Sequence, residues 1–143
     1  MTLAAILAEA KRADAPNILA AAIPYFRFLG LRVEAGDAGL LVVLPAERKL
    51  VGNPVLPALH GGVTGALMEA AAILELLWQR PDALLPKTIN LKVDYLRPAG
   101  LKDTLARAHV TKQGRRIAHV RIDAWQDQPD RPVAAAHAHF LLA

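Results

Sequence analysis

Residues 60–78 read HGGVTGALMEAAAILELLW, and this stretch determines how the rest of the chain must be arranged. It is rich in alanine and leucine and holds no proline, so it predicts one long α-helix over His60–Trp78. Apolar side chains lie nearly all the way round such a helix, which is typical of a helix that is buried rather than laid on a surface. We therefore expect the remaining elements to cover it on several sides.

The segments on either side of the long helix predict the elements that cover it. Two short helices and a hairpin are expected before it, over residues 2–13, 18–23, Leu31–Ala35 and Leu40–Leu44. Four strands are expected after it, over Thr88–Tyr95, Leu101–Thr111, Arg116–Trp125 and Val133–Leu142. Short turns between consecutive strands favour antiparallel pairing. The sequence thus predicts an α+β fold, an antiparallel sheet curled around one long central helix, with an N-terminal helical extension over residues 1–24.

Composition sets limits on the class of protein. A length of 143 residues fits a single domain over residues 1–143. The chain has no cysteine, which excludes disulfides and thiolate chemistry. We find no targeting segment and no apolar run close to the ~20 residues that cross a bilayer, so we expect a cytoplasmic protein with no membrane partner.

The net charge of +4 comes entirely from the last third of the chain. Residues 91–143 hold nine Lys and Arg against five Asp and Glu, whereas the two classes balance at eight each in residues 1–90. Such a basic region suits nucleic acid, a membrane, a phosphate-bearing ligand or solvent. We expect no nucleic-acid partner, because Trp78 and Trp125 are better suited to a core or an interface than to base stacking. We also expect no metal, because only two histidines, His137 and His139, share a strand face and no further ligand joins them.

The start of the long helix carries Gly61 and Gly62, and two glycines there let a ligand approach the backbone closely. The first amides of a helix have no internal partner and lie at the positive end of the helix dipole. A carbonyl oxygen that gains negative charge during acyl transfer is stabilised by such donors. The alternative is a tight turn that only leads into the helix.

Glu69 is the one charged residue between Gly61 and Leu74, in a helix that is expected to be buried. It shares a helical face with the small residues Gly62, Gly65 and Ala66, which leave room for a substrate or a second backbone. A buried, unpaired carboxylate is costly, so such a residue is usually paired or functional. The alternative is that Glu69 faces solvent, as Glu75 and Gln79 are expected to do.

These residues resemble the signature of a known family. His60-Gly61-Gly62 with an acidic residue nine positions after the histidine is similar to the signature of hotdog-fold thioesterases of the phenylacetate-degradation type, which include the 4-hydroxybenzoyl-CoA thioesterases. Residues 88–98, TINLKVDYLRP, resemble the strand that follows the helix in that family, and residues 112–115, KQGR, resemble its basic turn. The resemblance implies a hotdog fold and hydrolysis of an acyl-CoA by a homodimer, or by a tetramer built from two such dimers.

The resemblance also implies roles for particular residues. The Gly61 amide would polarise the thioester carbonyl, with His60 positioning that loop, and Glu69 would act as nucleophile or general base. Thr88 stands where some members place a residue that orients water. Many members carry an amide residue six positions before the histidine, where this chain has Pro54, so Asn53 would serve only if the loop is one residue longer. A plain Asn-Pro turn is the alternative.

The expected CoA-binding residues follow from charge, and the expected acyl group follows from the small residues of the long helix. Gly62 would lie close to the substrate, and the CoA phosphates would pair with Arg97, Lys112, Arg115 and Arg116. An aromatic or medium-chain acyl group suits the small residues of the long helix, and no cofactor is needed. Two alternatives remain: a hotdog enoyl-CoA hydratase, faintly suggested by residues 52–55, GNPV, and a non-catalytic acyl-CoA-binding module.

Overall fold

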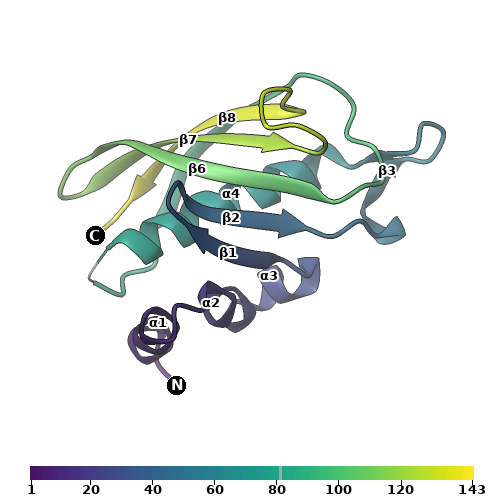
Figure 1. The fold of residues 1–143 in the computed structure, drawn as a ribbon. Coiled ribbons are helices and arrows are strands. Elements are labelled where there is room, and N and C mark those ends of the chain that lie inside the picture. Colours follow the sequence, from purple (N-terminus) through teal and green to yellow (C-terminus); the bar gives the residue numbers. More distant parts are fainter. Residues whose placement is uncertain (81) are drawn as a thin grey trace.

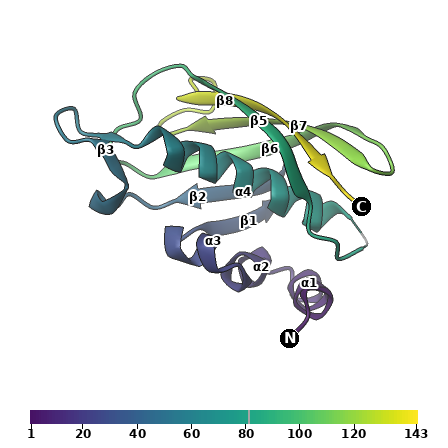
Figure 2. The same cartoon turned by 180° about the vertical axis from the view of Figure 1, so that it is seen from behind.

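A computed structural model describes residues 1–80 and 82–143 and shows a six-stranded sheet around one long helix (Figure 1). That helix, α4 (Gly61–Gln79), begins and ends within one residue of the predicted range. Seen from behind, α4 lies against one face of the sheet, and the N-terminal helices lie beyond the edge strand (Figure 2). The predicted α+β hotdog architecture is confirmed.

Three short helices precede the sheet: α1 (Leu3–Arg12), α2 (Pro16–Ala22) and α3 (Pro24–Leu29). The side-chain oxygen of Thr2 caps α1 by accepting a hydrogen bond from the Ala5 amide at 3.1 Å. Pro16 and Pro24 occupy the first positions of α2 and α3, where the missing proline N–H costs nothing. The sequence prediction ended the helical extension at residue 24 and missed α3, because Pro24 reads as a break although it starts a helix.

The sheet has the order β1-β2-β6-β7-β8-β5, and every neighbouring pair is antiparallel. Its strands are β1 (Arg32–Gly36), β2 (Gly39–Leu44), β5 (Lys87–Tyr95), β6 (Thr104–Gln113), β7 (Ile117–Trp125) and β8 (Ala134–Leu141). A one-turn 3-10 helix and two short strands come between β2 and α4: η1 (Arg48–Leu50), β3 (Val51–Asn53) and β4 (Ala58–Leu59).

The expectation that consecutive strands pair is wrong for β5 and β6. Strand β5 lies on the far edge beside β8, and β6 pairs with β2. The connector between them, residues 96–103, crosses the end of the molecule where α4 begins, and the Leu59 amide donates to the Ala99 carbonyl at 2.8 Å. A tight β5–β6 hairpin would have kept both strands on one side of α4. The crossover instead separates them in the sheet by β7 and β8.

Alanine side chains make the close packing of helix on sheet possible. Seven alanines on the helix-facing side of the sheet are at most 3% exposed: Ala106, Ala108, Ala118, Ala124, Ala134, Ala136 and Ala138. Alanine is normally depleted in strands. Here the small side chains let the large buried residues of α4, such as Leu67, Met68 and Leu74, fill the space between the layers.

Helix α4 is long and apolar enough to cross a membrane by length and composition alone, so the expectation that no apolar run approaches that length is wrong. In the fold, 61% of its most apolar window is buried inside the protein. The core helix of a globular protein passes the same test, so the finding is weak support for a membrane segment. The burial accounts for the apolar composition.

Glu75 is buried, at 3% exposure, and the expectation that it faces solvent is wrong. One carboxylate oxygen accepts a hydrogen bond from the Leu40 amide at 3.2 Å, and the other accepts one from the side-chain amide of Gln79 at 3.1 Å. The β1–β2 turn closes over the carboxylate at Gly39, whose φ is +98° and where an added Cβ would lie 2.3 Å from Glu75 Oε1. Glu75 therefore ties the far half of α4 to the first hairpin.

We expect Glu75→Ala to lower the free energy of unfolding by about 2 kcal/mol, because the Leu40 amide loses its partner in a buried place. Urea unfolding followed by circular dichroism measures this change. The control is Glu34→Ala, which removes the same charge from an exposed strand position and should change stability by less than about 0.5 kcal/mol. Equal stability of the two variants would show that the Glu75 contacts are energetically unimportant.

Candidate active site

His60 forms the N-cap of α4 with both its backbone and its ring. Its carbonyl accepts from the Val63 and Thr64 amides at 3.0 and 3.3 Å, and its Nδ1 accepts from the Gly62 amide at 2.9 Å. A ring nitrogen that accepts carries no proton, so in the neutral ring the proton lies on Nε2. In this geometry His60 shapes the start of the helix.

Gly61 presents an available amide at the positive end of α4. Its N–H has no hydrogen-bond partner within residues 1–80 and 82–143, whereas its carbonyl accepts from the Tyr95 hydroxyl at 2.7 Å. Close neighbours leave little space for a side chain at either glycine. A Cβ at Gly61 would lie 3.3 Å from the Tyr95 ring, and one at Gly62 would lie 3.0 Å from His60 Nδ1.

A cavity of about 450 Å³ opens beside the Gly61 backbone. Its lining is formed by β4, the start of α4, the end of β5 and the connector: Ala58, Leu59, Gly61, Thr64, Tyr95, Leu96, Arg97, Pro98, Ala99 and Val133. Most of these side chains are apolar. The cavity therefore combines a hydrogen-bond donor at one point of its wall with a surface that suits hydrocarbon.

Glu69 lies on the one side of α4 that the rest of the chain leaves partly open. Gly62, Ala66, Glu69 and Ile73 are partly or fully exposed, whereas most other positions of the helix are buried. They belong to the predicted small-residue face, of which Gly65 alone is buried. The Glu69 carboxylate accepts no hydrogen bond from any of the described residues, so it remains available for chemistry.

Gly61 and Glu69 of one chain lie too far apart to act on the same carbonyl group. Eight residues of helix separate them, which is about 12 Å along the axis at about 1.5 Å per residue. A glutamate side chain spans only part of that distance. One copy of the chain therefore presents the two expected catalytic groups as separate features of α4.

Asn53 is the exposed last residue of β3, and its side chain is used within the turn that follows. Its Oδ1 accepts from the Val55 and Leu56 amides at 3.0 and 3.4 Å, which makes an Asx-type turn. The side chain thus has the turn role that the sequence offered as the alternative to a role in the site.

Thr88 lies on the helix-facing side of β5, although strict alternation places it on the outer side with Asn90. A register shift between Thr88 and Asn90 makes the difference. Thr88 pairs with Phe140, which is fully buried against α4, whereas Asn90 pairs with His139 on the outer face. Both strand positions are exposed because β5 is an edge strand. The irregularity turns the hydroxyl group toward the side of the sheet that carries α4.

The four predicted phosphate-binding residues do not come together in one chain. Arg97 lines the cavity beside Gly61, whereas Lys112, Arg115 and Arg116 lie at or near the β6–β7 turn at the opposite end of the sheet (Figure 1). The length of β6 separates the two places by about 30 Å at about 3.3 Å per residue. Arg97 also borders a second, polar cavity of about 440 Å³ that contains Lys102 and Arg131. Sequence reasoning missed these two cations because they are far apart along the chain.

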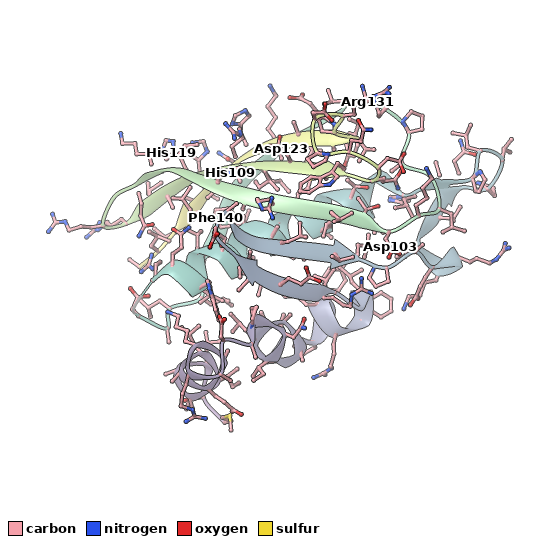
Figure 3. All side chains as sticks on the ribbon, viewed as in Figure 1. Asp103, His109, His119, Asp123, Arg131 and Phe140 are labelled. Atoms are coloured by element: carbon pink, nitrogen blue, oxygen red, sulfur yellow. The ribbon has the colours of Figure 1, made fainter. Side chains whose placement is uncertain are left out.

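The sheet face turned away from α4 carries most of the histidines. Figure 3 shows His109, His119 and Asp123 on this face, whereas Phe140 lies toward the helix. The His119 and His139 rings meet edge to face with centroids 4.2 Å apart, and His139 Nδ1 lies 2.7 Å from Asn90 Oδ1. No group of three or more metal-binding side chains occurs in the described part of the chain.

Several known proteins are similar to this chain in sequence or in structure. The family model described as the acyl-CoA thioesterase N-terminal domain matches residues 53–141. The medium/long-chain acyl-CoA thioesterase YigI of Salmonella typhimurium is 26% identical over 136 residues, which are 84% of this chain and 86% of YigI.

Two solved structures resemble the whole chain. A Chromobacterium violaceum protein is 38% identical, with a TM-score of 0.78 and 96% of each chain covered. A phenylacetic acid degradation-related protein from Ralstonia eutropha JMP134 is 26% identical, with a TM-score of 0.77, covering 95% of this chain and 98% of its own. Because the family model spans more than half of the sequence and includes the α4 site, this chain belongs to the acyl-CoA thioesterase family and is a hydrolase of thioesters with the hotdog fold.

Proposed function

We propose that this thioesterase hydrolyses medium-chain acyl-CoA esters to the free acid and CoA, with aromatic acyl-CoA esters as a second substrate class. The Gly61 amide beside the apolar cavity of about 450 Å³ is the observation that carries the proposal. YigI is named for medium/long-chain substrates, and the Ralstonia eutropha protein for phenylacetic acid degradation. The lining favours a hydrocarbon chain, because most of its side chains are apolar and none carries a negative charge.

The reaction needs two groups that act on one thioester carbonyl. The Gly61 N–H donates to the carbonyl oxygen and stabilises the negative charge that develops there. The Glu69 carboxylate either attacks the carbonyl carbon or removes a proton from an attacking water molecule. If Glu69 attacks, the C–S bond breaks as a mixed anhydride forms, and water then hydrolyses the anhydride to release the acid and restore the carboxylate. If Glu69 acts as a base, water attacks the carbonyl carbon directly and the C–S bond breaks. In both cases the CoA sulfur takes up a proton. Thr88 is proposed to hold the water molecule.

A homodimer is proposed to bring these two groups together, with Glu69 of one copy facing Gly61 of the other. The separation of about 12 Å along α4 supports this arrangement, because one chain cannot place both groups at one carbonyl. The partly open face of α4 offers the second copy a place to approach. In a twofold dimer such a contact occurs twice and forms two sites.

Strand β5 is the proposed contact between the two copies. It is a nine-residue edge strand, and long unpaired edges readily pair with another strand. Ile89 and Tyr95 on this strand are 52% and 58% exposed, and Leu84 and Leu85 before it are 53% and 50% exposed. Exposed apolar side chains along an unpaired edge favour a partner over solvent.

We expect Glu69→Gln to reduce turnover of every acyl-CoA in a thiol-release panel by at least about a thousand-fold, because the variant keeps the shape and loses the carboxylate. Binding of the same esters, measured by calorimetry, should survive. The matched control is Glu34→Gln, an exposed position on β1, which should retain wild-type turnover. Near-native turnover by pure Glu69→Gln would remove Glu69 from the reaction.

Mixing two inactive variants tests the shared site. Proline at Gly61, the first residue of α4, removes the proposed donor at a position where the helix backbone tolerates proline. The Tyr95 ring, 3.3 Å from the added Cβ, has to move by a few tenths of an ångström. Refolding Gly61→Pro with Glu69→Gln in equal amounts should return roughly a quarter of wild-type activity, because about half the dimers are mixed and each has one intact site. Each variant refolded alone should stay inactive. No recovery, with mixed dimers shown by mass spectrometry, would place both groups of a site in one chain.

The cations beside the Gly61 cavity are proposed to bind the CoA phosphates. We expect Arg97→Gln with Arg131→Gln to raise KM for acyl-CoA by about ten-fold, and to leave the hydrolysis of an N-acetylcysteamine thioester, which has no phosphate, within about two-fold. The comparison variant, Arg115→Gln with Arg116→Gln, removes two cations from the β6–β7 turn at the other end of the sheet. A larger effect there would assign the phosphates to the turn of a second copy. Equal losses on both substrates would mean that the arginines support the fold.

A further inference from the structure

The peptide group between Gly61 and Gly62 is held by hydrogen bonds at both of its ends. Its carbonyl oxygen accepts from the Tyr95 hydroxyl at 2.7 Å, and its N–H, which belongs to Gly62, donates to His60 Nδ1 at 2.9 Å. The two side chains are far apart in the sequence. His60 directly precedes α4, and Tyr95 is the last residue of β5, the strand that follows α4. One peptide plane is therefore restrained from two directions.

Such a restraint matters because glycine has the freest backbone of all residues, and two of them stand together here. The Gly61 N–H belongs to the preceding peptide, whose His60 carbonyl accepts from the Val63 and Thr64 amides. The restrained Gly61–Gly62 plane joins that peptide at the Gly61 Cα, so the direction of the Gly61 N–H depends on how firmly both planes are held. A hydrogen-bond donor stabilises a developing oxyanion best when it already points at the oxygen and need not reorient during the reaction. The His60 contact also occupies the Gly62 N–H, which leaves the Gly61 N–H as the available one of the two.

Tyr95 is itself held firmly by the sheet. It pairs with Ala134 at the end of β5, and the next two amides, of Leu96 and Arg97, both donate to the Val133 carbonyl at 2.9 and 3.3 Å. Its ring lies close to Gly61, where an added Cβ would be 3.3 Å away, and its hydroxyl would lie 3.6 Å from a Cβ at Gly65. Because Gly61 and Gly65 have no side chains, the Tyr95 ring can pack directly on the backbone of the first turns of α4.

We propose that Tyr95 is a positioning residue for the thioesterase reaction, which holds the Gly61–Gly62 peptide so that the Gly61 N–H points at the thioester oxygen. Tyr95 acts through Gly61 and transfers no proton to or from the substrate. The inference rests on the proposed role of Gly61 as oxyanion donor. It adds a residue that has no acid–base or nucleophilic part in the reaction and to which the sequence analysis gave no role beyond its place in the strand that resembles the family's.

The Tyr95→Phe variant tests the inference, because it keeps the ring and removes only the hydroxyl. We expect kcat for acyl-CoA hydrolysis to fall about ten-fold, with KM within about two-fold, since the lost interaction acts on the transition state. The chain has two tyrosines, so Tyr25→Phe is a matched control on α3 and should keep both constants. A wild-type kcat for Tyr95→Phe would overturn the role of Tyr95 and leave the proposed function intact. Failure of wild-type protein to hydrolyse any acyl-CoA would instead overturn the proposed function.

Two further measurements separate positioning from general support of the fold. In the Glu69→Gln background, infrared spectroscopy of a bound acyl-CoA labelled with ¹³C at the carbonyl should show a smaller downward shift of the C=O stretch when Tyr95→Phe is added. An unchanged shift would contradict the inference. The His60 and Tyr95 side chains restrain the same peptide, so the effects of His60→Ala and Tyr95→Phe on kcat should be coupled. The double variant should lose less activity than the product of the two single losses. Fully independent effects would show that the two side chains do not act on one donor.

Discussion

Helix α4 has more apolar surface than one side of a helix can bury, and the rest of the chain is arranged to cover it. The sheet curls round it, with alanines on the facing side so that the layers can approach closely. Strand β5 has to cross to the far edge to complete this cover, which explains why it does not pair with β6. The small-residue face of α4 that carries Glu69 is left partly open, because no element within residues 1–80 and 82–143 covers it.

The crossover of β5 also builds the site. The connector after β5 hydrogen-bonds to β4 just before α4 begins, so the end of β5, the connector and the helix start lie at one end of the molecule. This places Tyr95 on Gly61 and Arg97 beside the cavity. The topology that covers the helix therefore supplies the cavity wall, the restrained glycine loop and a nearby cation, which are the parts that we propose bind and polarise the thioester.

Two glutamates on the same helix show how position decides the use of a carboxylate. Glu75 follows Glu69 by six residues, which turns it by about 240° at about 100° per residue. Glu75 is consequently buried under the first hairpin, where the Leu40 amide and Gln79 satisfy it, and it holds the fold together. Glu69 lies on the partly open face, where no described residue satisfies it. A carboxylate without partners in a partly buried place is available to react, and the family to which the chain belongs hydrolyses thioesters.

The sequence by itself determined the features that depend on local pattern and composition. The long helix, the main strands, the His60-Gly61-Gly62 loop and Glu69 were all identified from local sequence. The solved structures agree with the fold, and the family model and YigI agree with the hydrolase class. Tertiary structure alone decided which strands pair, because β5 and β6 are neighbours in sequence yet are separated by the curl around α4. It also decided the burial of Glu75, the side of the sheet that Thr88 faces and the contact of Tyr95 with Gly61. Each of these depends on a partner distant in sequence or on a one-residue irregularity in the backbone, and a local pattern contains neither.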